Sequence, residues 1–294
     1  MLTFDQGKNK DIFNLINGLF MLIIVVIMLY PLYYVGIISI SDSQQVAKGR
    51  VHWYPIKISF AAYERILTNG QFMHSFVNTL MYTGVGTTIN LIMSSLCAYA
   101  LSRKKLPLNR FFTLIIIFTM YFSGGMIPMY ILVMNLGMID TIWSLVLPGA
   151  ISTYNMLVMR TFFVNVPEAL HEAAEIDGAS EFRKLVVLVL PLSMPVIATM
   201  VLFYAVDHWN SWFNAMIYLN TNSKYPLQLM VRNLVIEQNY GQYYSGVGRE
   251  IEDSVAATTI QYAGIIVATL PILLLYPALQ KYFVKGVMIG SVKG

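Results

Sequence analysis

The chain has 294 residues, of which 57% are hydrophobic and only 12% are charged. Soluble domains carry about 25% charged residues, so this chain has too few charges to coat a soluble protein of its size. The net charge of +4 does not indicate a nucleic-acid-binding face, because the basic residues lie in short clusters at the ends of apolar runs. Cys97 is the only cysteine, which excludes an intrachain disulfide. The composition is typical of a chain surrounded by lipid.

The first apolar run follows Lys8 and Lys10, as the hydrophobic region of a signal peptide would. However, the stretch from Ile12 to Ser41 carries no charge, is too long for a signal peptide and shows no small-x-small cleavage site. We therefore predict that it is retained as the first membrane span.

Six apolar runs are long enough to cross a bilayer core of about 30 Å as helices. Each should be helical, because backbone N–H and C=O groups cannot stay unpaired in hydrocarbon. Prolines in or near these runs are expected to mark kinks rather than helix ends. The runs lie near residues 13–38, 75–101, 111–134, 141–163, 190–219 and 256–283, and the prolines are Pro31, Pro128, Pro148, Pro195, Pro271 and Pro277. The sequence therefore predicts one all-α transmembrane domain over residues 1–294.

The short connections between runs predict the orientation. Arg103, Lys104, Lys105 and Arg110 join the second run to the third, which places that connection in the cytoplasm. The turn at 135–140 has no basic residue, as expected of an outer turn. Both termini are then cytoplasmic. Three polar segments remain, the outer segments 42–74 and 220–255 and the inner segment 165–189, and none could hold a soluble catalytic domain.

Local rules predict two short helices in the inner segment. Pro167 suits the first turn of a helix, and Glu168 in that turn favours the positive end of the helix dipole. Gly178 can adopt the left-handed conformation that closes a helix, and Ser180 is a good N-cap for the next one.

The same segment contains a motif with fixed spacing: Glu-Ala-Ala, three residues, Gly, nine residues, Ile, any residue, Leu, Pro. It falls on Glu172, Ala173, Ala174, Gly178, Leu188, Leu190 and Pro191, with Leu188 in the place of Ile. This stretch resembles the EAA loop of ABC importer permeases. Asp177 and Ala179, which flank the glycine, are similar to the carbohydrate-uptake branch of those permeases.

The resemblance covers nearly the whole chain. The segments Ser123–Pro128, Leu147–Gly149, Trp209–Asn210 and Gln280–Gly294 are similar to the polysaccharide/oligosaccharide permease subgroup. The resemblance implies a type I ABC importer permease fold, maltose-permease-like, with a cytoplasmic coupling helix. It implies a carbohydrate substrate and four kinds of partner: a second homologous permease in a heterodimer, two ATPase subunits, an extracytoplasmic solute-binding protein and the bilayer of the inner or plasma membrane.

In such an importer the first short helix of the loop sits in a cleft of an ATPase subunit and moves with it as a rigid body, which switches the spans between inward-open and outward-open states. ATP and Mg are bound by the partners, and this sequence contains no phosphate-loop motif. The chain is therefore not expected to be an enzyme or to hold a cofactor. The four histidines lie in separate segments without metal-ligand spacing. The candidate coupling residues are Glu168, Glu172, Ala173, Ala174, Asp177 and Gly178.

The fifth run holds the second unusual stretch, residues 207–214. Charged groups inside a span usually face a cavity or a partner, and sugars are bound by aromatic faces together with amides and carboxylates. On one helix Asp207, Asn210, Ser211 and Asn214 would share a face. The candidate substrate-path residues are Asp207, Trp209, Asn210, Ser211, Trp212 and Asn214. The alternative is packing between helices through polar side chains, with tryptophan at an interface belt. His208 is expected to be a hydrogen-bonded packing residue.

Two further segments have an expected role and an ordinary alternative. Segment 220–255 is a candidate contact for the binding protein, or a solvated connector. The tail Lys285–Gly294 is similar to tails that reach the ATPase interface, or is a frayed end.

A secondary transporter or channel would use intramembrane carboxylates, but Asp207 alone is thin support and the EAA loop would go unexplained. The substrate is left as an oligosaccharide or polysaccharide fragment, neutral or acidic. An acidic sugar would need positive charge on its route, and the basic residues that could supply it at the outer mouth are Lys48, Arg50, Arg232 and Arg249.

Overall fold

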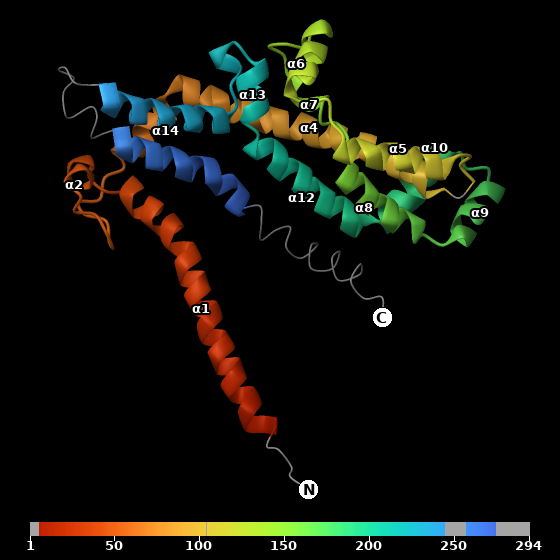
Figure 1. Cartoon of the computed structure of the whole chain (residues 1–294), viewed down its shortest axis with the longest axis horizontal. Helices are drawn as coiled ribbons and strands as arrows, with labels where there is room; N and C mark the ends of the chain where they lie inside the picture. Colours follow the sequence, from red (N-terminus) through yellow and green to blue (C-terminus); the bar gives the residue numbers. More distant parts are fainter. Residues whose placement is uncertain (1–5, 104, 245–256, 275–294) are drawn as a thin grey trace. The chain divides into compact units, whose positions relative to one another are not determined.

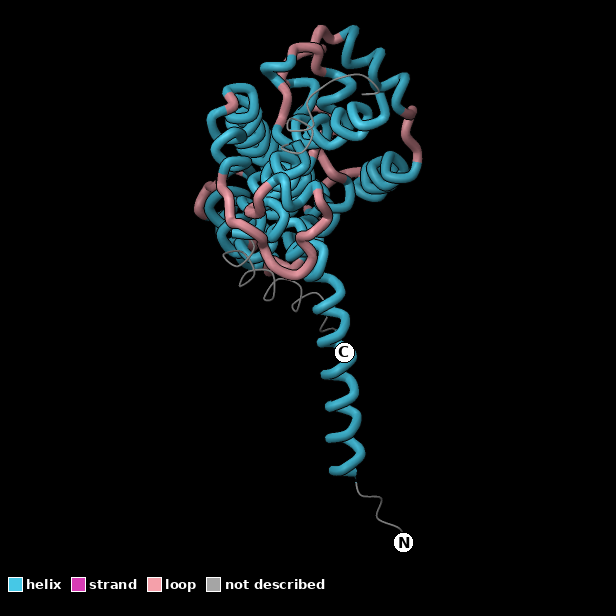
Figure 2. The backbone as a smooth tube through the Cα atoms, turned by 90° about the vertical axis from the view of Figure 1, so that its left-hand side faces the viewer, coloured by secondary structure: helices cyan, strands magenta, loops and turns pink. Residues whose placement is uncertain are grey.

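A computed structural model describes residues 6–103, 105–244 and 257–274, with side chains over 13–103, 105–236 and 257–274. Within these ranges the chain is helical, with loops between the helices and one isolated bridge between Ser41 and Ile58 (Figure 2). The described residues form two compact units. One contains residues up to 69 and from 233 to 269, and the other contains residues 70–232 together with the residues from 270.

The first unit begins with α1 (Gln6–Ser39), a continuous helix in which Pro31 makes no break. Two short helices follow, α2 (Ser43–Ala47) and α3 (Ala61–Thr68). Asp42 caps α2 by accepting a hydrogen bond from the Gln45 backbone N–H at 3.2 Å.

The second unit is built along α4 (Gly70–Ser102), the longest of its described helices. Two helices pack against α4, α8 (Thr153–Val164) and α12 (Met194–Asn210) (Figure 1). The core between them is apolar and contains Tyr99, Met156, Met159, Phe163, Val196, Met200 and Tyr204. At 1.5 Å per residue, α4 is about 50 Å long, so its two ends lie far apart.

Polar contacts tie α4 to its neighbours inside this core. The Asn90 amide donates to the Gly149 carbonyl at 2.6 Å, and its oxygen forms a 2.6 Å hydrogen bond with the ring of His208. Gly86 lies so close to that ring that a Cβ at position 86 would overlap it. His208 is thus a hydrogen-bonded packing residue, as expected from the sequence.

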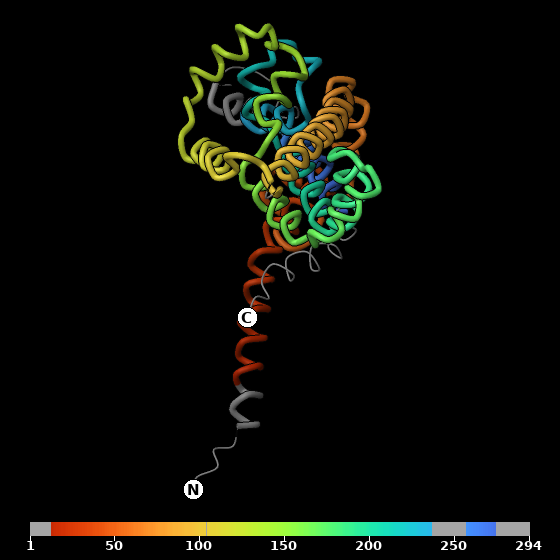
Figure 3. The backbone as a smooth tube through the Cα atoms, turned by 90° about the vertical axis from the view of Figure 1, so that its right-hand side faces the viewer, coloured from red at the N-terminus to blue at the C-terminus, as the bar shows by residue number. Residues whose placement is uncertain are grey.

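Three of the predicted spans are broken. The run near 111–134 forms α5 (Asn109–Tyr121) and α6 (Met126–Asn135), which are bent by 111° (Figure 3). The break contains Gly125 at φ 88°, a conformation that favours glycine.

The run near 141–163 is not one helix. It forms α7 (Trp143–Val146) and α8, separated by residues 147–152. Pro148 is expected from the sequence to mark a kink within one helix, but it lies after the end of α7. The Gly149 carbonyl has no partner within a helix there and accepts a hydrogen bond from the Asn90 amide instead.

The segment that leads into the run near 190–219 consists of α10 (Glu181–Lys184), a π-helical turn η1 (Leu185–Val189) and α11 (Leu190–Leu192), of which only α11 lies within the run. This segment is bent by 88° from α12. Pro191 and Pro195 lack the N–H groups that would bond to the carbonyls four residues earlier, which explains both the π-turn and the bend.

The remaining described helices are α9 (Glu168–Ile176), α13 (Phe213–Tyr218), the 3-10 turn η2 (Asn222–Lys224), α14 (Leu227–Tyr244) and a helix at Ala257–Leu274. Among the helices that the structure describes, three are long and apolar enough to cross a membrane alone: Phe13–Ser39, Gly70–Ser102 and Ala257–Leu274. Counting each bent pair as one span brings the number to five in the described residues, against six predicted, because residues 141–163 are divided.

Candidate functional site

The predicted coupling segment folds as its local sequence indicates. Helix α9 starts directly after Pro167 and ends at Ile176, and Gly178 adopts φ 73° in the turn that follows. The Ser180 hydroxyl caps α10 by accepting a hydrogen bond from the Arg183 backbone N–H at 3.3 Å. The two predicted helices are confirmed.

Lys184 fastens α9 to α10. Its side chain is buried, and its ammonium group donates to Glu175 at 3.0 Å and to Glu181 at 2.6 Å. Burial alone would lower the pKa of Lys184, but the hydrogen bonds to Glu181 and Glu175 outweigh it and raise that pKa. The hydrogen bonds from Lys184 and Lys105 lower the pKa of Glu175 to about 2. Lys184 and Glu175 are therefore both charged near neutral pH.

The connection between α4 and α5 supplies two more basic side chains. Arg103 contacts Glu168 at 3.5 Å and Glu181 at 3.7 Å, and Lys105 contacts Glu175 at 3.1 Å. We call this set the α9 clamp: Arg103, Lys105 and Lys184 with Glu168, Glu175 and Glu181. It holds α9 at both of its ends.

His171 fixes the middle of α9 to the end of α4. Its side chain is buried, and its ring centroid lies 6.4 Å from that of Tyr99, whose hydroxyl donates to Glu181 at 2.5 Å. Burial, and then the positive charge of Arg103, lowers the pKa of His171, so the imidazole is neutral at pH 7.

The opposite face of α9 is open. Glu172 and Ala173 are exposed, and Ile176 at its end is 87% exposed. Phe182, on α10, is 67% exposed. Two large apolar side chains with this much exposed surface, Ile176 and Phe182, suit contact with another protein.

The six predicted coupling residues thus divide by role. Glu168 belongs to the clamp, and Ala174 is partly buried behind the open face. Glu172 and Ala173 are on the open face, and Asp177 and Gly178 form the exposed turn.

Sequence reasoning missed the clamp. It used Arg103 and Lys105 only as markers of orientation and gave Lys184 no structural role, although Glu181 and Lys184 stand three residues apart, a spacing that pairs charges on a helix. The contacts of Arg103 and Lys105 join segments about 70 residues apart, and no local pattern indicates them.

The second predicted site lies at the other end of α12, and its expected geometry is wrong in part. Helix α12 ends at Asn210, and Ser211 is extended at φ −70° and ψ 118° before α13 begins. Asp207 and Asn210 are both exposed near the end of one helix, but Ser211 and Asn214 do not continue that face. The helix-breaking conformation at Ser211 and Trp212 is the reason.

The two tryptophans of this stretch, Trp209 and Trp212, differ in burial and in the side chains that they contact. Trp209 is buried, with its ring edge-on to Phe76 at 6.0 Å between centroids, so it packs inside the unit. Trp212 is partly exposed, and the guanidinium carbon of Arg232 lies 4.6 Å from its ring centroid. The Gln228 amide donates to the Asn210 side-chain oxygen at 3.5 Å. We call Asn210, Trp212, Gln228 and Arg232 the Trp212 cluster.

The segment that follows α13 is fastened to the first half of α4. Side chains of α4 donate to carbonyls of this segment: Gln71 to Asn222, Asn78 to Ser223 at 2.7 Å, and Tyr82 to Lys224 at 2.8 Å.

Asp140 closes the same region. It accepts hydrogen bonds from Lys224 at 2.6 Å and from the Thr221 hydroxyl at 2.7 Å, and these bonds hold its pKa well below the usual range. Asp140 itself adopts φ 59°, a left-handed conformation that aspartate tolerates better than most residues.

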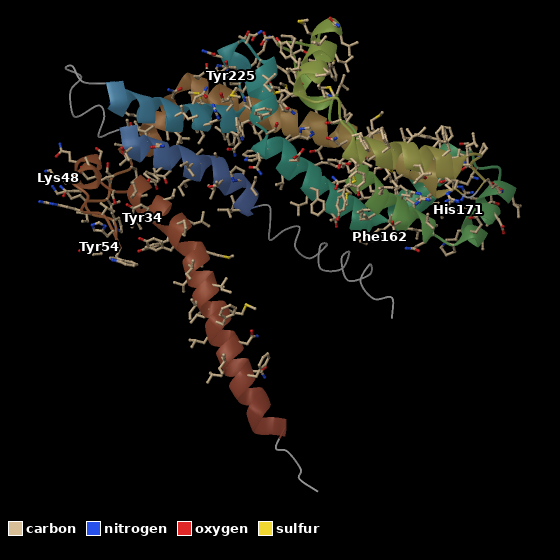
Figure 4. The ribbon with its side chains drawn as sticks, viewed as in Figure 1. Tyr34, Lys48, Tyr54, Phe162, His171 and Tyr225 are labelled. Atoms are coloured by element: carbon tan, nitrogen blue, oxygen red, sulfur yellow. The ribbon has the colours of Figure 1, made fainter. Side chains whose placement is uncertain are left out.

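Two sites therefore lie toward opposite ends of α4. Figure 4 labels His171 at the α9 end and Tyr225 at the other, both within the second unit. In the described part of the chain no cluster of His, Cys, Asp and Glu side chains could hold a metal ion. The Tyr- and Gly-rich part of segment 220–255 beyond position 236 and the tail Lys285–Gly294 lie outside the residues whose side chains the structure describes.

Apolar helices long enough to cross a membrane, together with a surface helix held by ion pairs, indicate the class of protein: a membrane permease subunit. The chain belongs to the family of binding-protein-dependent transport system inner membrane components, which it matches over residues 90–289. It is a transport subunit of the inner membrane and not an enzyme, and the resemblance to ABC importer permeases is confirmed.

Individual relatives agree with this family over the full length. The chain is 38% identical to the polygalacturonan/rhamnogalacturonan transport system permease protein YtcP of Bacillus subtilis, over 98% of this chain and 100% of that one. It is 37% identical to protein LplC of the same organism, over 99% and 98%.

Solved structures confirm the predicted fold class. A chain of a bacterial ABC transporter involved in the import of the acidic polysaccharide alginate matches with a TM-score of 0.86 and 32% identity, over 96% of this chain and 100% of that one. A chain of a bacterial alginate ABC transporter in complex with alginate pentasaccharide-bound periplasmic protein matches with a TM-score of 0.54 at 15% identity, which supports the fold alone.

Proposed function

We propose that this chain forms half of the translocation path of an ATP-driven importer for an oligosaccharide or polysaccharide fragment. A second homologous permease forms the other half, two ATPase subunits supply the energy, and a solute-binding protein delivers the sugar. ATP and Mg are bound by the ATPase subunits. The names of relatives support the substrate class, since one transports polygalacturonan and rhamnogalacturonan and another takes part in alginate import.

One observation carries the coupling role. Helix α9 is held to α4 and α10 by the α9 clamp, while Ile176 and Phe182 point outward, 87% and 67% exposed. A helix fixed on one face and open on the other transmits force from whatever covers the open face. We assign the ATPase subunit to that face and Glu172, Asp177 and Gly178 to the contact.

The orientation follows from this assignment. The ATPase subunits are cytoplasmic, so α9 and both chain termini lie in the cytoplasm. The region around Asp140, Lys224 and the Trp212 cluster then faces the outside, where the binding protein docks. This orientation agrees with the basic residues of the α4–α5 connection.

The test compares two glycines with the same backbone conformation. Gly178 (φ 73°) and Gly49 (φ 63°) are both exposed, and a Cβ at either position would have no neighbouring atom within 4 Å. Because both have positive φ, a tryptophan should cause similar backbone strain at each. In the reconstituted complex with its binding protein, Gly178→Trp should abolish sugar-stimulated ATP hydrolysis, and Gly49→Trp should retain at least half of it. Full stimulation with Gly178→Trp would refute the coupling role.

A further inference from the structure

We infer that Arg232, whose guanidinium group lies over the Trp212 ring, is a carboxylate-binding position on the sugar's route, so that this chain itself favours sugar acids over neutral sugars. The inference rests on the proposed function, because it assigns a specificity-determining residue within that path. The Trp212 cluster carries it.

The position of the guanidinium group is fixed by the ring beneath it. The Arg232 guanidinium carbon lies 4.6 Å from the Trp212 ring centroid, within the range of a cation–π contact. Trp212 in turn packs against a buried apolar group formed by Ala215, Leu219 and Leu229. A cation–π contact uses the charge of the guanidinium and does not take up a hydrogen-bond acceptor, so its five N–H donors can still bind a carboxylate.

Those donors have no carboxylate partner within the described chain. Ion pairs there involve Arg103, Lys105, Lys184 and Lys224, each with an acidic residue, whereas none involves Arg232. Lys224, eight positions earlier, is paired with Asp140 at 2.6 Å. Arg232 is thus a partly buried cation for which the described residues supply no carboxylate, the partner that a guanidinium prefers for bidentate contact.

The neighbours of Arg232 suit the rest of a sugar. Asn210 is exposed, and it is joined at 3.5 Å to Gln228, so two amides lie beside the same helix break. Amides donate to and accept from hydroxyl groups, and the exposed part of an indole ring contacts the apolar C–H face of a sugar ring. A guanidinium, two amides and an aromatic ring fit a uronate residue better than a neutral one, because only the uronate uses the guanidinium.

The experiment uses two ligands with the same sugar backbone, one with charged carboxylates and the other with neutral methyl esters. Initial uptake of trigalacturonate and of its methyl ester is measured with the reconstituted complex and its binding protein. The wild type should prefer the acid. In Arg232→Gln, uptake of the acid should fall about tenfold, as expected for one lost charge-assisted contact, and uptake of the ester should stay within about twofold. The binding protein is the same in every assay, so a changed ratio arises in the permease.

Two controls separate charge from folding. Arg232→Lys should restore part of the preference for the acid, and Arg65→Gln, which removes an exposed positive charge from α3, should leave the ratio unchanged. An equal fall for acid and ester, an unchanged ratio in Arg232→Gln, or a wild type that takes up only neutral sugars would overturn the inference and leave the importer intact. A wild-type complex that takes up no sugar at all would instead refute the proposed function.

Discussion

The two ends of α4 are held by different chemistry. At the α9 end, most contacts run between charged side chains: two carboxylates share the buried ammonium group of Lys184, and the Tyr99 hydroxyl of α4 donates to one of them, that of Glu181. At the other end, α4 donates from uncharged side chains such as Asn78 and Tyr82 to backbone carbonyls. The charged clamp fixes a helix whose outer face stays open, whereas the carbonyl contacts fix the path of a loop.

This difference indicates what each end does. Ion pairs at both ends hold α9 as one body, which suits an element that must move together with a partner. Hydrogen bonds from α4 side chains to backbone carbonyls hold residues 222–225 against α4. Near this loop, Lys224 is paired with Asp140, whereas Arg232 has no acidic partner among the described residues. One end is built for mechanical coupling and the other for presenting side chains.

The largest expected effect breaks the clamp at its buried member. Lys184→Met removes a buried ammonium group that two carboxylates share, and should lower stability measurably but modestly, because Glu175 and Glu181 are 38% and 58% exposed and remain hydrated without it. Sugar-stimulated ATP hydrolysis should fall at least tenfold, while basal hydrolysis continues. Both are measured on the reconstituted complex, together with its melting temperature.

Lys105→Met is the matched control, because Lys105 pairs with the same Glu175 but its side chain is 68% exposed. An exposed pair contributes up to about 1 kcal/mol, so stimulation should fall less than threefold. Equal effects of the two substitutions would show that the burial of Lys184 does not matter for the clamp.

A smaller effect is expected at the other end. Asp140→Asn removes the ion pair with Lys224 but keeps an oxygen that can accept from the backbone N–H groups of Asn220 and Thr221. We expect a loss of about 1 kcal/mol and less than a fivefold fall in uptake, with the ATPase coupling ratio unchanged. A loss of coupling in this variant would remove the distinction between the two ends.

The pH dependence of this contact has a definite sign. The folded-state pKa of Asp140 is below its ordinary value, so its contribution is fully present above about pH 4 and is lost as the pH falls through the lowered value. Between pH 5 and 8 the melting temperatures of the wild type and Asp140→Asn should therefore stay a constant distance apart. A gap that narrows within this window would contradict the assignment.

The sequence predicts well what is local. The N-cap Ser180 predicts the start of α10, and Gly178 predicts the turn that ends α9. The apolar runs follow from hydropathy. Each of these signals lies within a few residues of the feature that it predicts. The EAA spacing then identifies the family without any structure. These features need no knowledge of what packs against them.

The sequence predicts poorly what depends on distant partners. The clamp needs Arg103 beside Glu168, and the Trp212 cluster needs α14 to return against the end of α12. The breaks at Pro148 and Ser211 are set by contacts such as Asn90 with Gly149, which a proline or serine alone does not indicate. For this reason the shared face proposed for Asp207 to Asn214 was wrong beyond Asn210.

The most direct test of the central claim, that the open face of α9 seats on an ATPase subunit, is cross-linking from Ile176. In a Cys97→Ser background, Ile176→Cys carrying a benzophenone label should cross-link to the ATPase subunit in the assembled complex. Ile58→Cys, 64% exposed in the first unit, serves as the control and should not cross-link to it. A complex that hydrolyses ATP but yields no Ile176 cross-link to the ATPase would contradict the claim.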